Sequence, residues 1–338
     1  MLDKLGKNRN THIPILQTEL FMTVMQTQEN IERGLNELES KILACENLVV
    51  VHNENMNFHR FFDERFVKLV RNNINKFIVL VEGEDKNFPF PYQQHNNFCI
   101  EIQHNNSSLP NINHDVKTKD FLVLVGRPQL KRIELVKAME RLDLLNNSYV
   151  SCKASEFQCV YHLEEDIEGY KEDPYKICQI PFVPHFQNSK LSVVMETVME
   201  EISYQLSEKI YKPLMTEHPF VVLAPVGYLK YLRSQGYQTF SKWIDESYDN
   251  EPDINKRIEM IAKVCQDFVE SDVALFYRQT EGVRQHNRKK FFDTKPVRLD
   301  LKLSLTSPWL MGACDLHVES ELESSPHDPD LSHEGYNS

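Results

Sequence analysis

The sequence predicts an α/β protein of two lobes, each with a parallel sheet, on the basis of three observations. Continuous apolar runs such as "NLVVVHN" (47–53) and "KFIVLVEGE" (76–84) are typical of strands buried on both faces. Amphipathic stretches of helical period lie between such runs, and a strand, a helix and a strand at this spacing indicate a βαβ unit. The series restarts near residue 119, which indicates a second unit of the same kind.

The length of 338 residues allows two domains of ordinary size. We expect residues 1–118 to form an N-terminal lobe and residues 119–300 to form a C-terminal lobe. Residues 301–338 form an extension, whose acidic end (319–338) contains many Ser, Pro and His residues and predicts a disordered tail.

The N-terminal lobe is expected to alternate helices with strands. In order, the pattern predicts an irregular lead-in (1–16), a helix (17–45), a strand (47–53), a helix (58–73), a strand (76–84), and a segment of many Asn, Pro and His residues (85–118) with a strand at "FCIEIQ" (98–103).

The C-terminal lobe is expected to repeat this alternation. The pattern predicts a strand at 119–128, a helix at 130–145, a strand or turn at 148–154, an acidic loop at 163–176, a strand at 191–197, a helix opening at 207–215 with Ser207 as its N-cap, a strand at 219–225, and helices at 227–237, 254–271 and 274–292.

Composition restricts the class of protein. The net charge of −12 argues against a general binder of duplex nucleic acid, because such proteins present a basic face. The seven cysteines form no CxxC pair and no zinc-type Cys/His spacing, which favours free thiols in a reducing compartment. The sequence has no apolar core of signal-peptide length and no run of about 18 apolar residues, so we expect a cytoplasmic protein without a transmembrane segment.

Charged side chains follow the predicted strands of the C-terminal lobe. Arg127 and Arg132 follow the first strand, Glu196 follows a second, and the triplet Ser207-Glu208-Lys209 opens the next helix. Cations at a helix N-terminus can hold a phosphate, and a neighbouring carboxylate can accept hydrogen bonds from ribose hydroxyls. The pattern thus predicts a nucleotide or nucleotide-sugar site, the alternative being that these side chains are solvated or paired with glutamates. Neither GxGxxG nor GxxxxGK[ST] occurs.

The segments "FLVLVGRPQLKRIELVKAMERLDLL", "LSVVMET", "LSEKIYKPLMTEHPFVVLAPVGYLKYLRSQGYQTF" and "IDESYD" resemble the C-terminal half of phage and bacterial glycosyltransferase-like proteins. More remotely, they are similar to the donor domain of the family 10 α1,3-fucosyltransferases. The resemblance covers about residues 119–293. It implies the GT-B fold, which has two Rossmann-like lobes, and a nucleotide-sugar donor as co-substrate rather than a bound cofactor.

The resemblance also implies roles for individual residues. Arg132 and Lys209 would bind the donor diphosphate, Glu208 the ribose, and Glu196 would line the site. Two departures leave the base and the sugar open. The tyrosine that commonly precedes the triplet is replaced by Gln205-Leu206, and Glu196 is followed by Thr197 where the fucosyltransferases have Asn.

An inverting transfer needs a general base to deprotonate the acceptor hydroxyl. We expect it at the strand ends of the N-terminal lobe, which would be the acceptor side. The candidates are Glu54, Glu82 and Glu84, followed by His52 and Asp85.

Two charged stretches have alternative interpretations. The acidic stretch 243–253 contains Asp245, Glu246, Asp249, Glu251 and Asp253, which could bind Mg²⁺ or could serve helix starts and domain packing. We favour the second, since GT-B enzymes generally use no catalytic metal. The run "RQHNRKK" (284–290) could contact nucleic acid phosphates, but a solvated helix face is the favoured interpretation.

The leading hypothesis is therefore a metal-independent glycosyltransferase that moves a sugar from a nucleotide sugar to a hydroxyl acceptor, such as a glycan or a lipid-linked glycan. One alternative is a catalytically inactive protein of the same fold that serves in binding or assembly. Another, motivated by the run at 284–290, is transfer to modified nucleic acid bases.

Overall fold

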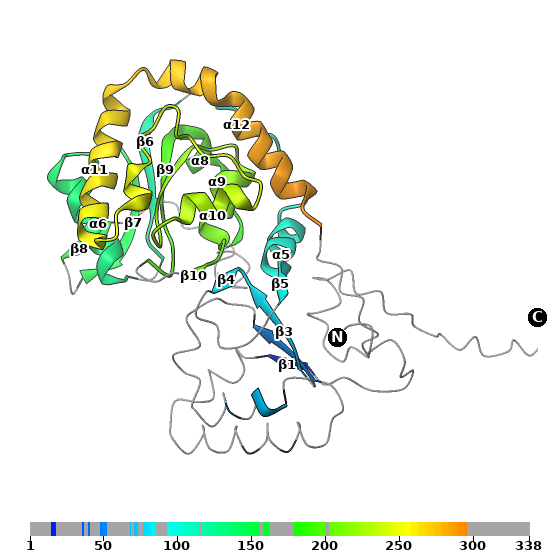
Figure 1. Cartoon of the computed structure of the whole chain (residues 1–338). Coiled ribbons are helices and arrows are strands. Elements are labelled where there is room, and N and C mark those ends of the chain that lie inside the picture. The colour runs from blue at the N-terminus through cyan, green and yellow to red at the C-terminus, as the bar shows by residue number, and fades with distance from the viewer. Residues whose placement is uncertain are drawn as a thin grey trace, which may run out of the picture.

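The computed structural model describes residues 15–17, 36, 40, 48–52, 68, 71–73, 77–85, 93–114, 117–126, 128–155, 158–161, 179–199 and 203–295 (Figure 1). They confirm the α/β class. Arg127, Glu54, the extension 301–338, the acidic loop 163–176 and most of the helices expected at 17–45 and 58–73 lie outside the described residues.

A mixed sheet of five strands forms the centre of the C-terminal part. Its strands are β6 (Lys119–Leu124), β7 (Tyr149–Ala154), β8 (Cys159–Tyr161), β9 (Ser189–Met195) and β11 (Phe220–Leu223). Their order is β11-β9-β6-β7-β8, and β8 runs antiparallel to β7. The expectation of a purely parallel sheet was therefore wrong. The short connection at 155–158 forces the chain to turn back, because a parallel strand needs a crossover of about a dozen residues.

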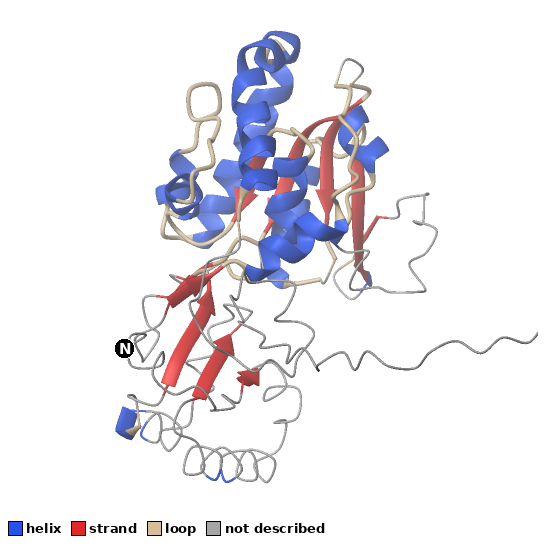
Figure 2. Ribbon diagram, turned by 90° about the vertical axis from the view of Figure 1, so that its right-hand side faces the viewer, coloured by secondary structure: helices blue, strands red, loops and turns tan. Residues whose placement is uncertain are grey.

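Helices cover both faces of this sheet (Figures 1 and 2). They are α6 (Leu130–Arg141), α8 (Val183–Asn188), α9 (Glu208–Met215), α10 (Tyr228–Ser234), α11 (Ile254–Glu270) and α12 (Val273–Asp293). In Figure 1, α6 and α11 pack together on one side of the sheet, and α8 and α9 lie on the other. The expected helices of this region and the N-cap at Ser207 are confirmed.

The connections that leave the neighbouring strands β6 and β9 lead to opposite edges of the sheet. From β6 the chain passes through α6 to β7, and from β9 it passes through α9 to β11 on the other side. The carboxyl ends of β6 and β9 therefore form a topological switch point. In open α/β sheets, ligands bind in the crevice at such a point.

The N-terminal part contains a four-stranded parallel sheet of order β1-β2-β3-β5. Its strands are β1 (Ile15–Gln17), β2 (Leu48–His52), β3 (Phe77–Glu82) and β5 (Gln93–His95). The strands expected at 47–53 and 76–84 are confirmed. Strand β1 corrects the expected irregular lead-in, because three residues are too few for periodicity to indicate a strand.

The segment "FCIEIQ" forms helix α5 (Asn97–Asn105) and not the expected strand. The apparent alternation at residues 98, 100 and 102 is misleading, since the most deeply buried side chains are those of Cys99, Ile102 and Asn106. This spacing of three and four residues marks one helix face. Helix α5 packs against α9 and α12.

The basic run 284–290 forms the solvated face that the sequence indicated only in part. Gln285, His286 and Lys289 are exposed, whereas Arg284 and Asn287 are 7% and 2% exposed. Arg284 donates to the backbone carbonyls of Glu217 and Tyr277, and Arg288 donates to those of Met215 and Leu109. Helix α12 packs along α9, and the face of the run that meets α9 binds backbone carbonyl groups. Arg284 and Arg288 are therefore less available to bind a nucleic acid phosphate.

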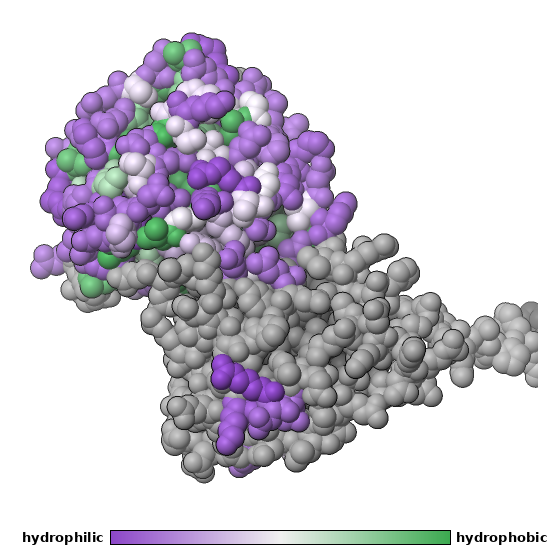
Figure 3. All heavy atoms as spheres, viewed as in Figure 1, coloured by the Kyte–Doolittle hydropathy of each residue, from purple (hydrophilic) through white to green (hydrophobic). Residues whose placement is uncertain are grey.

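The visible surface of the C-terminal part is mainly hydrophilic (Figure 3). Among the described helices, none has the length and apolar character needed to cross a bilayer.

Gly83 lies where the N-terminal sheet meets the segment that leads to α9. Strand β4 (Glu84–Asp85) pairs antiparallel with β10 (Ser203–Tyr204), and the backbone of Gly83 lies against the carbonyl of Tyr204. Gly83 also has a φ of +86°, which L side chains rarely adopt.

We predict that Gly83→Ala lowers the free energy of unfolding by more than about 1 kcal/mol, because the added Cβ would overlap the Tyr204 carbonyl oxygen and the backbone would be strained. The measurement is urea unfolding followed by circular dichroism. The control is Gly282→Ala in α12, where a Cβ meets no atom within 4 Å. Equal stabilities of the two variants would contradict the prediction.

Candidate functional site

The structure brings five of the predicted site residues together at the switch point. Arg132 lies in the first turn of α6, Glu196 follows β9, and Ser207, Glu208 and Lys209 open α9. With Tyr228 they form a set of residues joined by hydrogen bonds, here named the Glu196 cluster (Arg132, Glu196, Ser207, Glu208, Lys209 and Tyr228).

Glu196 is the buried centre of this cluster. Its side chain is 3% exposed, and its two carboxylate oxygens accept hydrogen bonds from Ser207 Oγ (2.6 Å) and from the Tyr228 hydroxyl (2.8 Å). Burial raises the pKa of Glu196 although the Lys209 cation and the Ser207 hydroxyl act in the opposite direction. The carboxylate thereby ties the end of β9 to the starts of α9 and α10.

Arg132 approaches the same strand end from α6. Its guanidinium donates through Nη2 (2.8 Å) and Nε (3.3 Å) to the backbone carbonyl of Glu196. The residue is only 2% exposed, and in this conformation its guanidinium stabilises the end of β9 from within the protein. Arg132 and Lys209 thus contact neighbouring residues, Glu196 and Thr197, from two different helices.

Glu208 and Lys209 form the part of the cluster that solvent reaches, with side chains 18% and 25% exposed. Lys209 Nζ donates to Glu208 Oε1 (2.6 Å) and to Thr197 Oγ1 (3.2 Å). Burial acts to raise the pKa of Glu208, but the adjacent Lys209 cation outweighs it and the pKa is lowered. Glu208 is therefore held as a carboxylate, beside a cation and the N-terminus of α9.

This arrangement suits a ligand that carries both an anion and hydroxyl groups. Lys209 can donate to an oxyanion, and the dipole of α9 favours negative charge at the same place. The Glu208 carboxylate can accept hydrogen bonds from hydroxyl groups but has no proton to donate. Ser207 is already engaged, since its Oγ accepts from the backbone N–H of Lys209 (3.2 Å) and donates to Glu196.

Two residues that support this strand edge were not identified from the sequence. Tyr228 donates a hydrogen bond to Glu196, and Arg257 donates to the carbonyls of Met199 (2.9 Å) and Ala224. Arg257 is 2% exposed. Their partners are distant in the sequence or lie in other elements, so no local spacing could indicate them.

The acidic stretch 243–253 serves helix starts and loop packing. Asp253 is the N-cap of α11, and Asp249 binds the start of α10. Glu246 accepts from Arg233 Nη1 (3.0 Å), from the Thr239 hydroxyl and from a backbone N–H. No cluster of three or more His, Cys, Asp or Glu residues suited to a metal ion occurs in the described part of the chain.

Of the proposed general bases, Glu84 is paired with Tyr204 across β4 and β10, and Tyr204 lies three residues before Ser207. Burial is the main cause of the raised pKa of Tyr204, and the charge of Glu84 adds to it. Glu82 and His52 lie in β3 and β2, where only the backbone is described.

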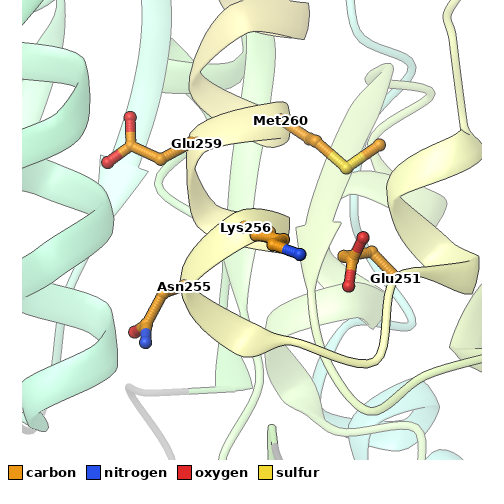
Figure 4. A pocket seen from close by; sticks show the side chains of 5 residues that line it. All are labelled: Glu251, Asn255, Lys256, Glu259 and Met260. Atoms are coloured by element: carbon orange, nitrogen blue, oxygen red, sulfur yellow. The ribbon is translucent and has the colours of Figure 1, made fainter.

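A shallow groove of about 460 Å³ lies along the first turns of α11 (Figure 4). It is lined by Glu251, Asn255, Lys256, Glu259 and Met260. Two of these side chains are bound to α6: Asn255 accepts from Lys131 and Glu259 accepts from Arg141. The groove is lined by α11 and the segment before it, and it shares no residue with the Glu196 cluster, which comes from α6, β9, α9 and α10.

We predict that Glu196→Gln changes how stability depends on pH. The raised pKa means that, above the ordinary value of 4.5, the folded protein holds a proton that the unfolded chain has lost. The free energy of unfolding of the wild type therefore falls as the pH rises through this window, and the Gln variant lacks that fall. In urea unfolding from about pH 4 to about pH 8, the free energy of unfolding of the variant should rise relative to that of the wild type as the pH increases.

The matched control for this experiment is Glu259→Gln, whose side chain is 63% exposed. Parallel pH curves for the wild type and Glu196→Gln would show that the carboxyl group does not carry this proton.

Comparisons with family models, with curated proteins and with solved structures gave no match. What the chain can bind is therefore inferred from the charges and hydrogen bonds of the Glu196 cluster.

Proposed function

We propose that the protein is a glycosyltransferase that takes a sugar from a nucleoside diphosphate sugar and transfers it to a hydroxyl acceptor, a glycan or a lipid-linked glycan. The observation that carries the proposal is the position of the Glu208–Lys209 pair, at the N-terminus of α9 and at the switch point of β6 and β9. The resemblance of residues 119–293 to glycosyltransferase-like proteins supports it.

In this proposal Lys209 leaves Glu208 and donates to the diphosphate. Negative charge grows on the diphosphate as the sugar departs, so a cation placed there stabilises the transition state. Glu208 then accepts from the ribose hydroxyls. Arg132 holds the carbonyl of Glu196 and so positions the strand end, and it would reach the diphosphate only after that contact opens.

The acceptor would enter from the side of the N-terminal sheet, in a GT-B-like arrangement. The pairing of β4 with β10 supports this, because it brings Glu84 next to the segment before Ser207. Glu84 is then the preferred general base. The protein would act in the cytoplasm, on the donor pool present there.

We predict that calorimetry with GDP and UDP sugars detects binding to the wild type and that Lys209→Ala weakens it about 10-fold to about 100-fold. This is the loss expected for a hydrogen bond to a charged group of about 1.5–3 kcal/mol. The control is Lys230→Ala, an exposed lysine of α10. An absence of binding to the wild type at about millimolar nucleotide would refute the proposal.

The second candidate function is a catalytically inactive binding or assembly protein. It is favoured by one observation: Lys209 is already paired and Arg132 is already bound to a backbone carbonyl. Turnover of any nucleotide sugar, measured as donor hydrolysis, would exclude this candidate, whereas binding without turnover would favour it.

A further inference from the structure

Two buried thiols lie in contact in the hairpin formed by β7 and β8. The Sγ atoms of Cys152 and Cys159 are 3.3 Å apart, and the residues are 0% and 2% exposed. The strand register pairs Cys152 with Tyr161 and Cys159 with Ala154, so the two cysteines are diagonal neighbours. The short link between the strands is what brings them together.

We propose that Cys152 and Cys159 form a reversible disulfide when the protein meets a low-molecular-weight disulfide such as oxidised glutathione. The two sulfurs must approach from 3.3 Å to the bonding distance of about 2.05 Å. This requires a small shift of one strand and no rearrangement of the fold. The hairpin is thus a site of covalent modification separate from the Glu196 cluster.

The geometry also indicates that the disulfide would be easily reduced. Diagonal neighbours of an antiparallel pair have Cα atoms about 7–8 Å apart, whereas disulfides usually join Cα atoms about 4.4–6.8 Å apart. The bond would draw β8 along β7 and would carry strain. Strained disulfides have more oxidising potentials, so thiols reduce them readily.

Access to the thiols requires local opening of the hairpin. Burial, followed by the hydrogen bond with Cys152, raises the pKa of Cys159 to about 12, so the closed hairpin protects its thiol. Strand β8 has three residues and lies at the edge of the sheet, where Val160 is 48% exposed. Opening such an edge costs less than global unfolding, and it exposes both cysteines together.

The chemistry proceeds in two exchanges. In the open hairpin the Cys159 thiol loses a proton, and its thiolate attacks one sulfur of oxidised glutathione, which forms a mixed disulfide and releases one glutathione thiolate. The deprotonated Cys152 then attacks Cys159 Sγ and releases the second glutathione thiolate. Two protein thiols are oxidised, one small disulfide is reduced to two thiols, and the protons lost from the cysteines are taken up by the released thiolates.

The experiment treats the full chain with oxidised glutathione, blocks the remaining thiols by alkylation, and maps the peptides by mass spectrometry. We expect the wild type to lose two of its seven thiols and to yield a Cys152–Cys159 linked peptide, which a dithiol reductant removes. Cys152→Ala and Cys159→Ala should each abolish this linkage. The control is Cys265→Ala, which removes a lone buried cysteine of α11 and should leave the linkage intact.

Retention of all seven thiols, or glutathione adducts without the linked peptide, would overturn the proposal. The same holds if the two-thiol loss persists in Cys159→Ala. The result on the wild type alone decides the case if a variant fails to fold.

Discussion

The buried carboxylate of Glu196 is the constraint on which the strand edge depends. A carboxylate at 3% exposure is costly to desolvate unless hydrogen bonds replace its water. Ser207 and Tyr228 supply these bonds, and they come from the starts of two different helices. The need to hydrogen-bond the Glu196 carboxylate therefore fixes where α9 and α10 begin relative to β9. These two hydrogen bonds explain how a buried glutamate can follow so apolar a strand.

The same carboxyl edge is held by buried guanidinium groups. Arg132 binds the carbonyl at the end of β9, and Arg257 binds the carbonyl of Ala224 just past β11. Carbonyl groups at strand ends have lost their ladder partners, and a buried arginine offers several donors to them. With these groups engaged internally, the ion pair of Glu208 and Lys209 is the part of the Glu196 cluster that is more open to a ligand.

The sequence predicted correctly the strands that are buried on both faces. It was misleading for helices in which only one face is buried. Strands such as β9 and β11 are buried on both faces, so a continuous apolar run identified them. Helix α5 was misread because its apolar residues also fit an alternating pattern. The charged residues of the run 284–290 predicted a solvent-exposed helix face, but Arg284 and Arg288 donate to backbone carbonyls of Glu217 and Met215.

The linear pattern was sufficient for the α/β class, for most elements after residue 119 and for the N-cap at Ser207, because apolar periodicity and capping are local properties. Folding decided the rest. Whether Arg132 meets a ligand or a carbonyl, and whether Lys209 is open or paired, depends on residues brought together from separate helices and strands. Tyr228 reaches Glu196 across 32 positions of the chain, and no local spacing encodes such a contact.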